Sequence, residues 1–316
     1  MLSTTGIHHI TAMVNDAQRT IDFYASVLGL RLVKKTINFD RPEVYHLYFG
    51  NETGDPGTVI TFFPWPKQLK GRIGTGQVGV TSYAIPEDAL AFWQNRLKTF
   101  QIEYQTATRF GEQYVQFEDP DGLLIELVER KNGKLSTWEF GGITKDVAIK
   151  GFAGAILYSA QPNETAYVLE DILGLQTVGQ EDEFLRFATD ESTNQMIDIK
   201  LTASVRGLMG AGTVHHIAWR AKDEQEHQRW RELLTDKGFH PTEFKDRNYF
   251  QAIYVQEKGG ILFEIATDEP GFTVDEELEH LGEQLQLPEW LEAKREELEE
   301  LVPTIEVRTL EEEEQS

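Results

Sequence analysis

The sequence predicts an α+β protein that is built from four copies of one βαβββ module and ends in a helical extension. The first observation behind this prediction is a repeat. An alternating strand, an amphipathic helix and three short β-rich segments follow one another four times in the 316 residues. The second is that the first and fourth copies open with nearly the same residues, HHIT at 8–11 and HHIA at 215–218. We expect two domains of two modules each, at 5–130 and 150–268, with the extension at 269–316.

The elements of each module follow from hydrophobic periodicity and from turn residues. Each helix is expected to end at a turn, and Gly29, Gly174 and Gly238 suit the left-handed residue that follows a helix. The predicted helices are Ala17 to Leu28, Glu87 to Thr99, Glu164 to Ile172 and Glu224 to Asp236. The predicted strands are 8–14, 31–38, 45–51 and 58–65 in the first module, 78–85, 103–110, 113–120 and 123–130 in the second, 152–160, 175–180, 183–189 and 196–203 in the third, and 213–221, 242–248, 250–256 and 261–268 in the fourth.

The borders of the predicted domains are marked by changes in composition. A charged stretch at 131–137, followed by Gly141 and Gly142, reads as a linker between the second and third modules. After about residue 268 the sequence becomes acidic and helix-forming, and it ends in the run Glu311 to Glu314. We expect that run to be a solvated tail.

Composition narrows the classes of function. The net charge of −23, from 30 Lys and Arg against 53 Asp and Glu, repels nucleic acid phosphates and anionic lipid, so we expect neither partner. The chain has no apolar run of the ~20 residues that a bilayer requires and no signal-like N-terminus, which predicts a cytoplasmic protein. Because there is no cysteine, any metal must be held by histidine and carboxylate side chains.

Three residues form the predicted metal site. Side chains alternate along a strand, so His9 and Thr11 share the face opposite the apolar one, and His216 takes the same place in the fourth module. Glu264 lies inside an apolar strand, where a carboxylate is costly unless it is paired or ligated. Aligning the first module with the fourth puts Thr61 where Glu264 stands. Two histidines and one carboxylate are the set that leaves open positions on a non-haem iron(II).

Several of these residues and motifs also have simpler explanations. Any one of these histidines on its own is readily explained as an ordinary hydrogen-bonded strand residue, but the matched pairs favour a metal. Glu126 has the strand position of Glu264 in the second module, yet no histidine opens that module, so we interpret it as structural. The glycines from Gly71 to Gly79 lack the strand, helix and lysine of a nucleotide loop. Since the ligands lie in modules one and four, we expect these modules to meet around the metal and modules two and three to form a metal-free counterpart.

The whole chain resembles a known family. The repeated modules, the HHIT and HHIA openings and the segment GILFEIATDEPGF resemble ring-cleaving dioxygenases of the glyoxalase/bleomycin resistance/vicinal oxygen chelate superfamily, especially the hydroquinone dioxygenase branch. The stretches at 32–65 and 287–303 are similar to that branch as well. The resemblance implies the vicinal oxygen chelate fold and O2-dependent cleavage of a hydroquinone- or catechol-type ring. It also implies iron(II), with manganese(II) as the second choice, bound by His9, His216 and Glu264.

The resemblance also implies which residues take part in the reaction. His215 and Tyr254 would transfer protons, Arg247 would stabilise developing negative charge, and His8 and Thr11 would orient the substrate. His46, Phe272 and Trp290 fall in segments that the family shares, without a role that the sequence assigns. The aromatic segment from Phe62 to Trp65 suits either the wall of a pocket for a flat ring or core packing.

Two other functions compete with ring cleavage. One is a glyoxalase-type isomerase or thiol transferase, against which Thr61 argues because those enzymes resemble a site with a fourth ligand. The other is a metal-free protein that sequesters an aromatic compound. The expected partners of the favoured function are a small aromatic diol and O2. The sequence allows a homodimer and leaves open whether the two hydroxyls are ortho or para.

Overall fold

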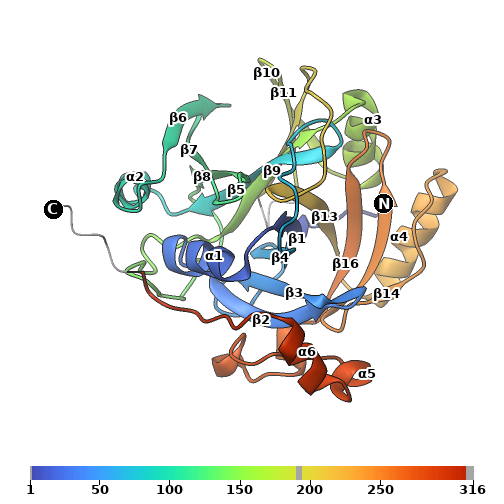
Figure 1. Ribbon diagram of the computed structural model, residues 1–316. Coiled ribbons are helices and arrows are strands. Elements are labelled where there is room, and N and C mark those ends of the chain that lie inside the picture. The colour runs from blue at the N-terminus through green and yellow to red at the C-terminus, as the bar shows by residue number, and fades with distance from the viewer. Residues whose placement is uncertain (1, 190–193, 311–316) are drawn as a thin grey trace.

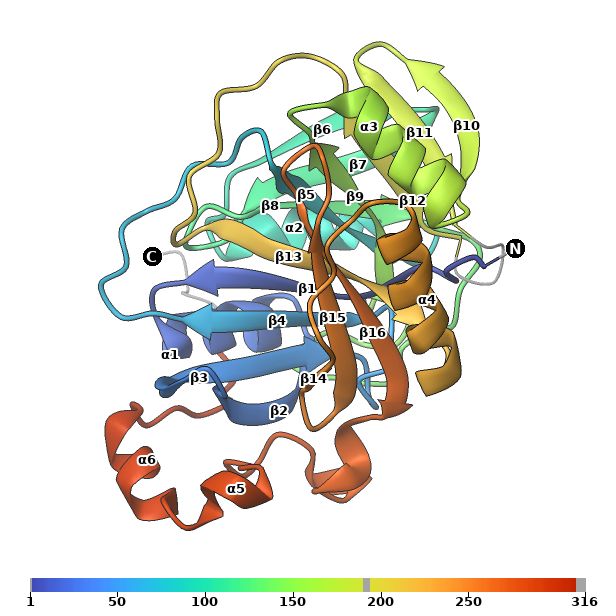
Figure 2. The same ribbon diagram turned by 90° about the vertical axis from the view of Figure 1, so that its right-hand side faces the viewer.

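The computed structural model describes residues 2–189 and 194–310. In this part of the chain, two curled eight-stranded sheets lie side by side, with helices on their outer faces (Figures 1 and 2). This agrees with the α+β fold of repeated βαβββ modules that the sequence predicts. None of the described helices has the length and apolar character needed to cross a bilayer.

The first sheet combines the first and fourth modules, as the positions of the predicted ligands require. Its strand order is β14-β15-β16-β13-β1-β4-β3-β2, with the antiparallel pair β1 and β13 at the centre. Each central strand pairs in parallel with the last strand of its own module, β1 with β4 and β13 with β16, so the two modules are related by an approximate twofold axis. The strands are β1 (Ile7–Val14), β2 (Arg31–Asn38), β3 (Arg41–Gly50), β4 (Val59–Pro64), β13 (Thr213–Ala221), β14 (Lys245–Asp246), β15 (Phe250–Gln256) and β16 (Leu262–Pro270).

The second sheet combines the second and third modules in the same way. Its order is β10-β11-β12-β9-β5-β8-β7-β6, with β5 and β9 antiparallel at the centre. Each sheet therefore takes one module from each predicted domain, and the division at 5–130 and 150–268 stays a prediction. The strands are β5 (Gln77–Ile85), β6 (Tyr104–Arg109), β7 (Glu112–Glu118), β8 (Leu124–Glu129), β9 (Gly151–Tyr158), β10 (Gln176–Glu181), β11 (Phe184–Ala188) and β12 (Met196–Lys200).

The helices of the four modules lie close to where the sequence predicts them. Asp16 caps the first helix by accepting a hydrogen bond from the Arg19 N–H. The second helix starts later than predicted because Asp88 adopts a positive φ of 66°, which a right-handed helix excludes. The elements are α1 (Ala17–Ile21) with the π-helical turn η1 (Asp22–Val27), α2 (Leu90–Thr99), α3 (Pro162–Tyr167) with η2 (Val168–Ile172), and α4 (Glu224–Asp236).

One predicted strand is much shorter in the structure. In the segment 242–248 the regular ladder with β15 is limited to Lys245 and Asp246, as strand β14. Asn248 has a positive φ of 66° and ends the pairing in a tight turn. The side chain of Arg247 is therefore presented from a turn rather than from a strand.

The described part of the C-terminal extension contains short helical turns joined by irregular chain. These are η3 (Phe272–Val274), η4 (Leu278–His280), α5 (Glu289–Glu292) and α6 (Arg295–Leu301). The extension runs beside β2, the edge strand of the first sheet (Figure 2). Its backbone bonds to that strand, since the Gln286 N–H donates to the Lys35 carbonyl at 2.9 Å. The predicted acidic tail, Glu311 to Glu314, lies outside the described residues.

Candidate metal centre

The three predicted ligands meet at the centre of the first sheet. His9 lies on β1 and His216 on the neighbouring β13, where the register pairs His9 with Ala218. Ala218 in turn pairs with Glu264 on β16. The candidate ligand atoms of the three residues all lie within 4.8 Å of one another. His9 and His216 come together although they are separated by some two hundred residues, because the central strands of the two modules pair.

Each of the three side chains is almost completely buried, at 2% exposure for His9, 4% for His216 and 0% for Glu264. His216 Nε2 lies 2.9 Å from Glu264 Oε2, and His9 Nε2 lies 3.6 Å from the same oxygen. The two Nε2 atoms are 3.2 Å apart. All three side chains thus direct their ligand atoms into one small volume.

The carboxylate of Glu264 is the strongest sign of a cation. Neither of its buried oxygens has a partner that meets hydrogen-bond geometry among the described residues, although His216 Nε2 lies 2.9 Å from Oε2. Burial would raise the pKa of Glu264, but His9 and His216 lower it well below its usual value. A buried, ionised carboxylate without donors is costly unless a cation is bound. These residues therefore fit a divalent metal ion.

Each ligand histidine is held by the histidine before it. His8 Nδ1 lies 2.9 Å from His9 Nδ1, and His215 Nδ1 lies 2.8 Å from His216 Nδ1. One nitrogen of each pair must carry the proton. If Nε2 of the ligand is free to bind a metal, its Nδ1–H is the donor and the preceding histidine accepts. The first pair favours this tautomer, because His8 Nε2 must donate to the Thr267 carbonyl and so leaves His8 Nδ1 as the acceptor; the second pair is compatible with it.

The two supporting histidines differ in what their other nitrogen contacts. His8 Nε2 lies 3.0 Å from the Thr267 carbonyl, to which it donates in this tautomer, and burial followed by the charge of His9 lowers the pKa of His8 well below its usual value. His215 lines the pocket beside the ligands, and burial lowers its pKa to about 3. With its Nδ1 accepting from His216, His215 presents an Nε2–H to the pocket.

A cavity of about 240 Å³ adjoins the ligands, and we call it the metal pocket. Aromatic rings form much of its wall, and polar side chains border the rest. It is lined by His9, Met13, Asn38, Phe39, Asp40, Arg41, His46, Tyr48, Phe63, Trp65, His215, His216, Arg247, Phe250 and Tyr254. Phe63 and Trp65 thus line the pocket, whereas Phe62 is buried in the core.

Arg247 and Tyr254 lie together in this wall. The Arg247 Nε–H donates to the Tyr254 hydroxyl at 3.2 Å, and Arg247 Nη1 donates to Asp40 at 3.1 Å. Tyr254 stands opposite Glu264 in the register of β15 and β16. Burial and the charge of Glu264 raise the pKa of Tyr254, so its hydroxyl keeps its proton. The structure therefore brings a protonated phenol and a guanidinium close to the ligands.

The remaining predicted residues, His8 and Thr11, do not line the metal pocket. Thr11 is fully buried, and its hydroxyl lies 2.8 Å from that of Thr61. Thr61 is in turn 2.8 Å from His46 Nε2, and His46 Nδ1 is 2.8 Å from the Tyr48 hydroxyl. This chain of polar groups ends in the pocket. An orienting effect of His8 or Thr11 on a substrate would have to pass through neighbouring side chains.

Tyr48 is a pocket residue that the sequence did not single out. It stands opposite Thr61 in β3 and β4, as Tyr254 stands opposite Glu264 in β15 and β16. The alignment of the two modules that matches Thr61 with Glu264 also matches Tyr48 with Tyr254, and this is the signal that points to Tyr48.

In the second sheet an arginine, Arg109, takes the place of a cation between two buried carboxylates. Arg109 donates to both oxygens of Glu126, at 3.1 and 2.8 Å. Ser82 and Gln116 donate to the same carboxylate at 2.8 and 3.0 Å. Glu126 is thereby fully hydrogen bonded, which agrees with its interpretation as structural.

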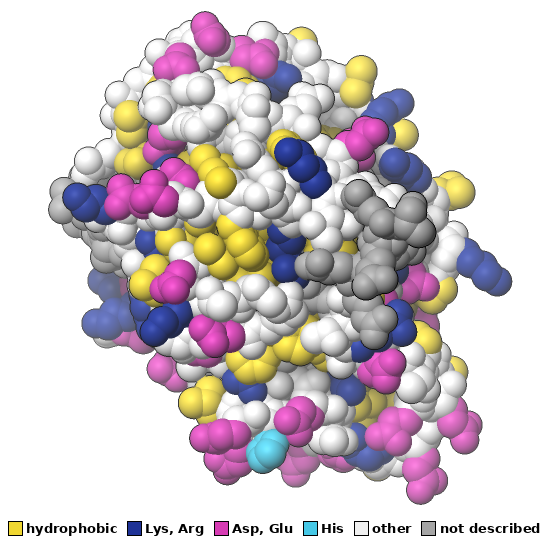
Figure 3. Space-filling model, turned by 90° about the vertical axis from the view of Figure 1, so that its left-hand side faces the viewer, with side chains coloured by type: hydrophobic (Ala, Val, Ile, Leu, Met, Phe, Trp, Pro, Cys, Tyr) yellow, Lys and Arg dark blue, Asp and Glu magenta, His cyan; other side chains and the backbone are white. Residues whose placement is uncertain are grey.

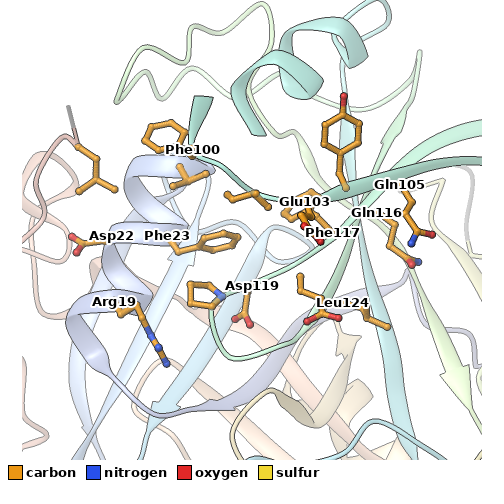
Figure 4. A pocket seen from close by; sticks show the side chains of 16 residues that line it. Arg19, Asp22, Phe23, Phe100, Glu103, Gln105, Gln116, Phe117, Asp119 and Leu124 are labelled. Carbon is orange, nitrogen blue, oxygen red and sulfur yellow. The ribbon is translucent and has the colours of Figure 1, made fainter. Parts of the chain in front are cut away.

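A larger cavity, about 580 Å³, lies elsewhere, between η1 and strands β6 and β7 (Figure 4). On the α2 side of the molecule, hydrophobic side chains gather near the centre of the face, with acidic and basic ones around them (Figure 3). The most buried acid of the cavity, Asp119, accepts hydrogen bonds from the Tyr24 hydroxyl and from the backbone of residues 121–123. Because its charge is already satisfied, this cavity offers no reactive group comparable to Glu264.

Comparisons with known proteins show the family of the chain. Residues 6–127 match the family described as the Glyoxalase/Bleomycin resistance protein/Dioxygenase superfamily. The chain is 56% identical, over 97% of its length and 98% of the relative, to "Putative ring-cleaving dioxygenase MhqO" of Bacillus subtilis. It is 35% identical, over 93% of its length and 94% of the relative, to chlorohydroquinone/hydroquinone 1,2-dioxygenase of Sphingobium indicum. A crystal structure titled as a putative dioxygenase from Bacillus subtilis matches with a TM-score of 0.97 and 55% identity, covering 98% of this chain and 100% of that chain.

Proposed function

Because the chain belongs to the glyoxalase/bleomycin resistance protein/dioxygenase superfamily, with ring-cleaving dioxygenases as its near relatives, we propose that it is a non-haem iron(II) dioxygenase that cleaves an aromatic diol. His9, His216 and Glu264 are its proposed ligands. The observation that carries the proposal is their convergence within 4.8 Å, with a threonine in place of a fourth ligand at position 61. Manganese(II) is the second candidate for the ion.

The donor set suits this chemistry. Bound iron(II) would supply open coordination positions for a phenolic oxygen and for O2, and a path for electrons between them. The protein would supply a dry cavity with aromatic walls and fixed donors. A flat ring would be held between such walls, with one hydroxyl directed at the ion and away from bulk water.

Three side chains have proposed roles toward the substrate. The His215 Nε2–H donates a hydrogen bond to a substrate oxygen, and the ring, held at Nδ1 by His216, passes the phenolic proton from one substrate oxygen to another. The Tyr254 hydroxyl, bonded to Arg247, donates a second proton or hydrogen bond. Arg247 stabilises the negative charge that develops on oxygen. His8 and Thr11 act indirectly, His8 by orienting His9 and Thr11 through Thr61.

The name of one relative favours a para-diol. That relative is described as acting on hydroquinone and chlorohydroquinone, and it matches nearly the whole chain. We therefore propose a hydroquinone as the substrate class, with a catechol as the alternative.

The two competing functions are less well supported. An isomerase or thiol transferase would be favoured by a fourth protein ligand, and Thr61 instead bonds to Thr11 and His46. A metal-free binding protein would leave the carboxylate of Glu264 buried without a donor, at a high cost in stability.

Oxygen uptake tests the proposal. Protein purified anaerobically and loaded with one iron(II) should consume O2 when a para- or ortho-dihydroxybenzene is added, and the aromatic absorbance should disappear. The variants His9→Ala, His216→Ala and Glu264→Gln should lose this activity together with their iron. Full activity in all three variants would rule out the proposed site. Tight substrate binding without iron or O2 uptake would support the sequestering protein.

A further inference from the structure

The turn between β2 and β3 forms one wall of the metal pocket. Its residues Asn38, Phe39, Asp40 and Arg41 all line the cavity. The turn itself is compact, because Asn38 Oδ1 accepts hydrogen bonds from the N–H groups of Asp40 and Arg41 at 2.9 and 3.2 Å. The pairing of β2 with β3 is irregular beyond Ile37. The position of the turn over the pocket therefore depends on what its side chains contact.

Three different parts of the molecule hold this turn. The ring of Phe39 packs edge-on against Trp290 of the C-terminal extension, with centroids 5.6 Å apart. The Asp40 carboxylate accepts from Arg247 Nη1 at 3.1 Å. The Arg41 guanidinium lies 5.6 Å from the centre of the Trp65 ring. Each anchor ties the wall to a separate segment of the chain.

The extension is itself fixed to the sheet, so Trp290 is a firm anchor. The ammonium group of Lys34, completely buried on β2, donates to both Asp275 and Glu276. At the next residue of β2, the Lys35 carbonyl accepts a hydrogen bond from the Gln286 N–H of the extension. Trp290 nevertheless remains 56% exposed, which is unusual for so large an aromatic side chain. Its contact with Phe39 gives a reason for its place.

Asp40 acts on the reaction site through Arg247. The same guanidinium donates to Asp40 and to the Tyr254 hydroxyl, so the carboxylate sets its orientation beside the metal ligands. Asp40 is 71% exposed, and an ion pair this accessible to solvent adds little to stability. Its effect should therefore appear in the reaction rather than in folding.

We propose that Trp290 and Asp40 control the metal pocket through its other wall residues: Trp290, from outside the pocket, acts through Phe39 and sets the size of substrate that enters, and Asp40, itself in the wall, positions the Arg247 guanidinium for the reaction. The inference rests on the proposed function. The cavity of about 240 Å³ is smaller than the ~300–1,000 Å³ of sites for drug-sized ligands, so it suits one ring with small substituents. Loosening this wall should admit rings with larger substituents.

The size effect is tested with Trp290→Ala. Selectivity is the kcat/KM for tert-butylhydroquinone divided by the kcat/KM for hydroquinone. This ratio should be about fivefold higher or more in the variant than in the native enzyme, which is within the range that pocket size can control. Hydrogen–deuterium exchange in a peptide that spans residues 36–45 should also increase, because the turn loses an anchor. Leu301→Ala is the matched control, since Leu301 lies in the same extension with 54% exposure against 56% for Trp290. It should change neither readout.

The positioning effect is tested with Asp40→Asn. We expect kcat to fall about three- to tenfold with KM for hydroquinone nearly unchanged, and Asp40→Glu to restore most of the loss. The control is Glu243→Gln, which removes a similarly exposed ion pair, with Arg231, from the module that contains Arg247. Unchanged kinetics in Asp40→Asn would overturn this part of the inference.

Failure of the inference differs from failure of the proposed function. If the native enzyme consumes O2 but Trp290→Ala leaves substrate selectivity and exchange at 36–45 unaltered, the wall does not set substrate size. If the native enzyme consumes no O2 with any diol, the proposed function fails. The exchange experiment then still reports whether Trp290 holds the turn.

Discussion

Thr61 and Glu264 stand at equivalent places in the two modules of the first sheet. Thr61 pairs with Thr11 on β1, and Glu264 pairs with Ala218 on β13, in the same parallel arrangement. The twofold repeat therefore presents two sites for an acidic ligand and fills one of them. Because Thr61 occupies the second of these places, we expect an open centre with three protein ligands.

Replacing Thr61 with glutamate should close that centre. Thr61→Glu puts a second carboxylate beside the ion, so the variant should retain iron but lose most O2 uptake, because a position needed by substrate or O2 is taken. Metal content and oxygen consumption would be measured on the same preparation. Thr61→Ser is the control, since it keeps the hydroxyl that bonds to Thr11 and His46 and adds no ligand. An active, iron-loaded Thr61→Glu enzyme would contradict the open-centre account.

His8 should matter for metal affinity. His8→Ala removes the group that fixes the tautomer of His9, and loss of such a partner typically weakens metal binding ~10–100-fold. Competition with a chelator would measure the change. His227→Ala is a matched control because His227 is also buried, and it contacts a backbone carbonyl, that of Ile265 at 2.9 Å, in the way that His8 contacts Thr267. Equal affinities for the two variants would show that His8 does not support the site.

His215 should make metal-free protein sensitive to acid. Burial lowers its folded-state pKa to about 3, whereas the unfolded chain titrates near 6.5. Between these values the unfolded state binds more protons, so the contribution to stability is complete above pH 6.5 and is lost as the pH falls toward 3. Urea unfolding of metal-free protein at pH 7 and pH 5.5 should show a loss of stability, of up to ~1.4 kcal/mol per pH unit from this group. The loss should be smaller in His215→Asn, and an identical slope in both proteins would count against the assignment.

The arginine in the second sheet should be a structural requirement. Arg109→Met leaves Glu126 and its neighbour Asp198 without their shared cation, and breaking a buried pair typically costs ~3–5 kcal/mol. Urea unfolding would measure it. Arg231→Met, which breaks a much more exposed pair, should cost at most ~1 kcal/mol. A cost for Arg109→Met as small as that of the control would mean that the second sheet does not depend on this ion pair.

The repeat explains why so much could be predicted from the sequence. His9 and His216 have matched places in two copies of one module, and pairing of those copies follows from where the ligands lie. Alternation along a strand then gives the face of each ligand.

Other features depend on contacts that no repeat pattern records. The ion pair of Arg247 with Asp40 joins residues some two hundred positions apart, through a turn whose conformation is set by Asn248. The packing of Trp290 on Phe39 depends on how an irregular extension follows the edge strand. Local propensity also misplaced the start of the second helix, because Asp88 takes a positive φ.

The central claim is that one ion is held by His9, His216 and Glu264, and crystallography with anomalous scattering at the iron edge tests it most directly. Crystals grown anaerobically with iron(II) should show one strong peak, within about 2.0–2.3 Å of a nitrogen of each histidine and of a Glu264 oxygen. The remaining positions should be taken by water or by an added hydroquinone. A peak bound mainly by other residues, or none at these three side chains in fully loaded protein, would contradict the account.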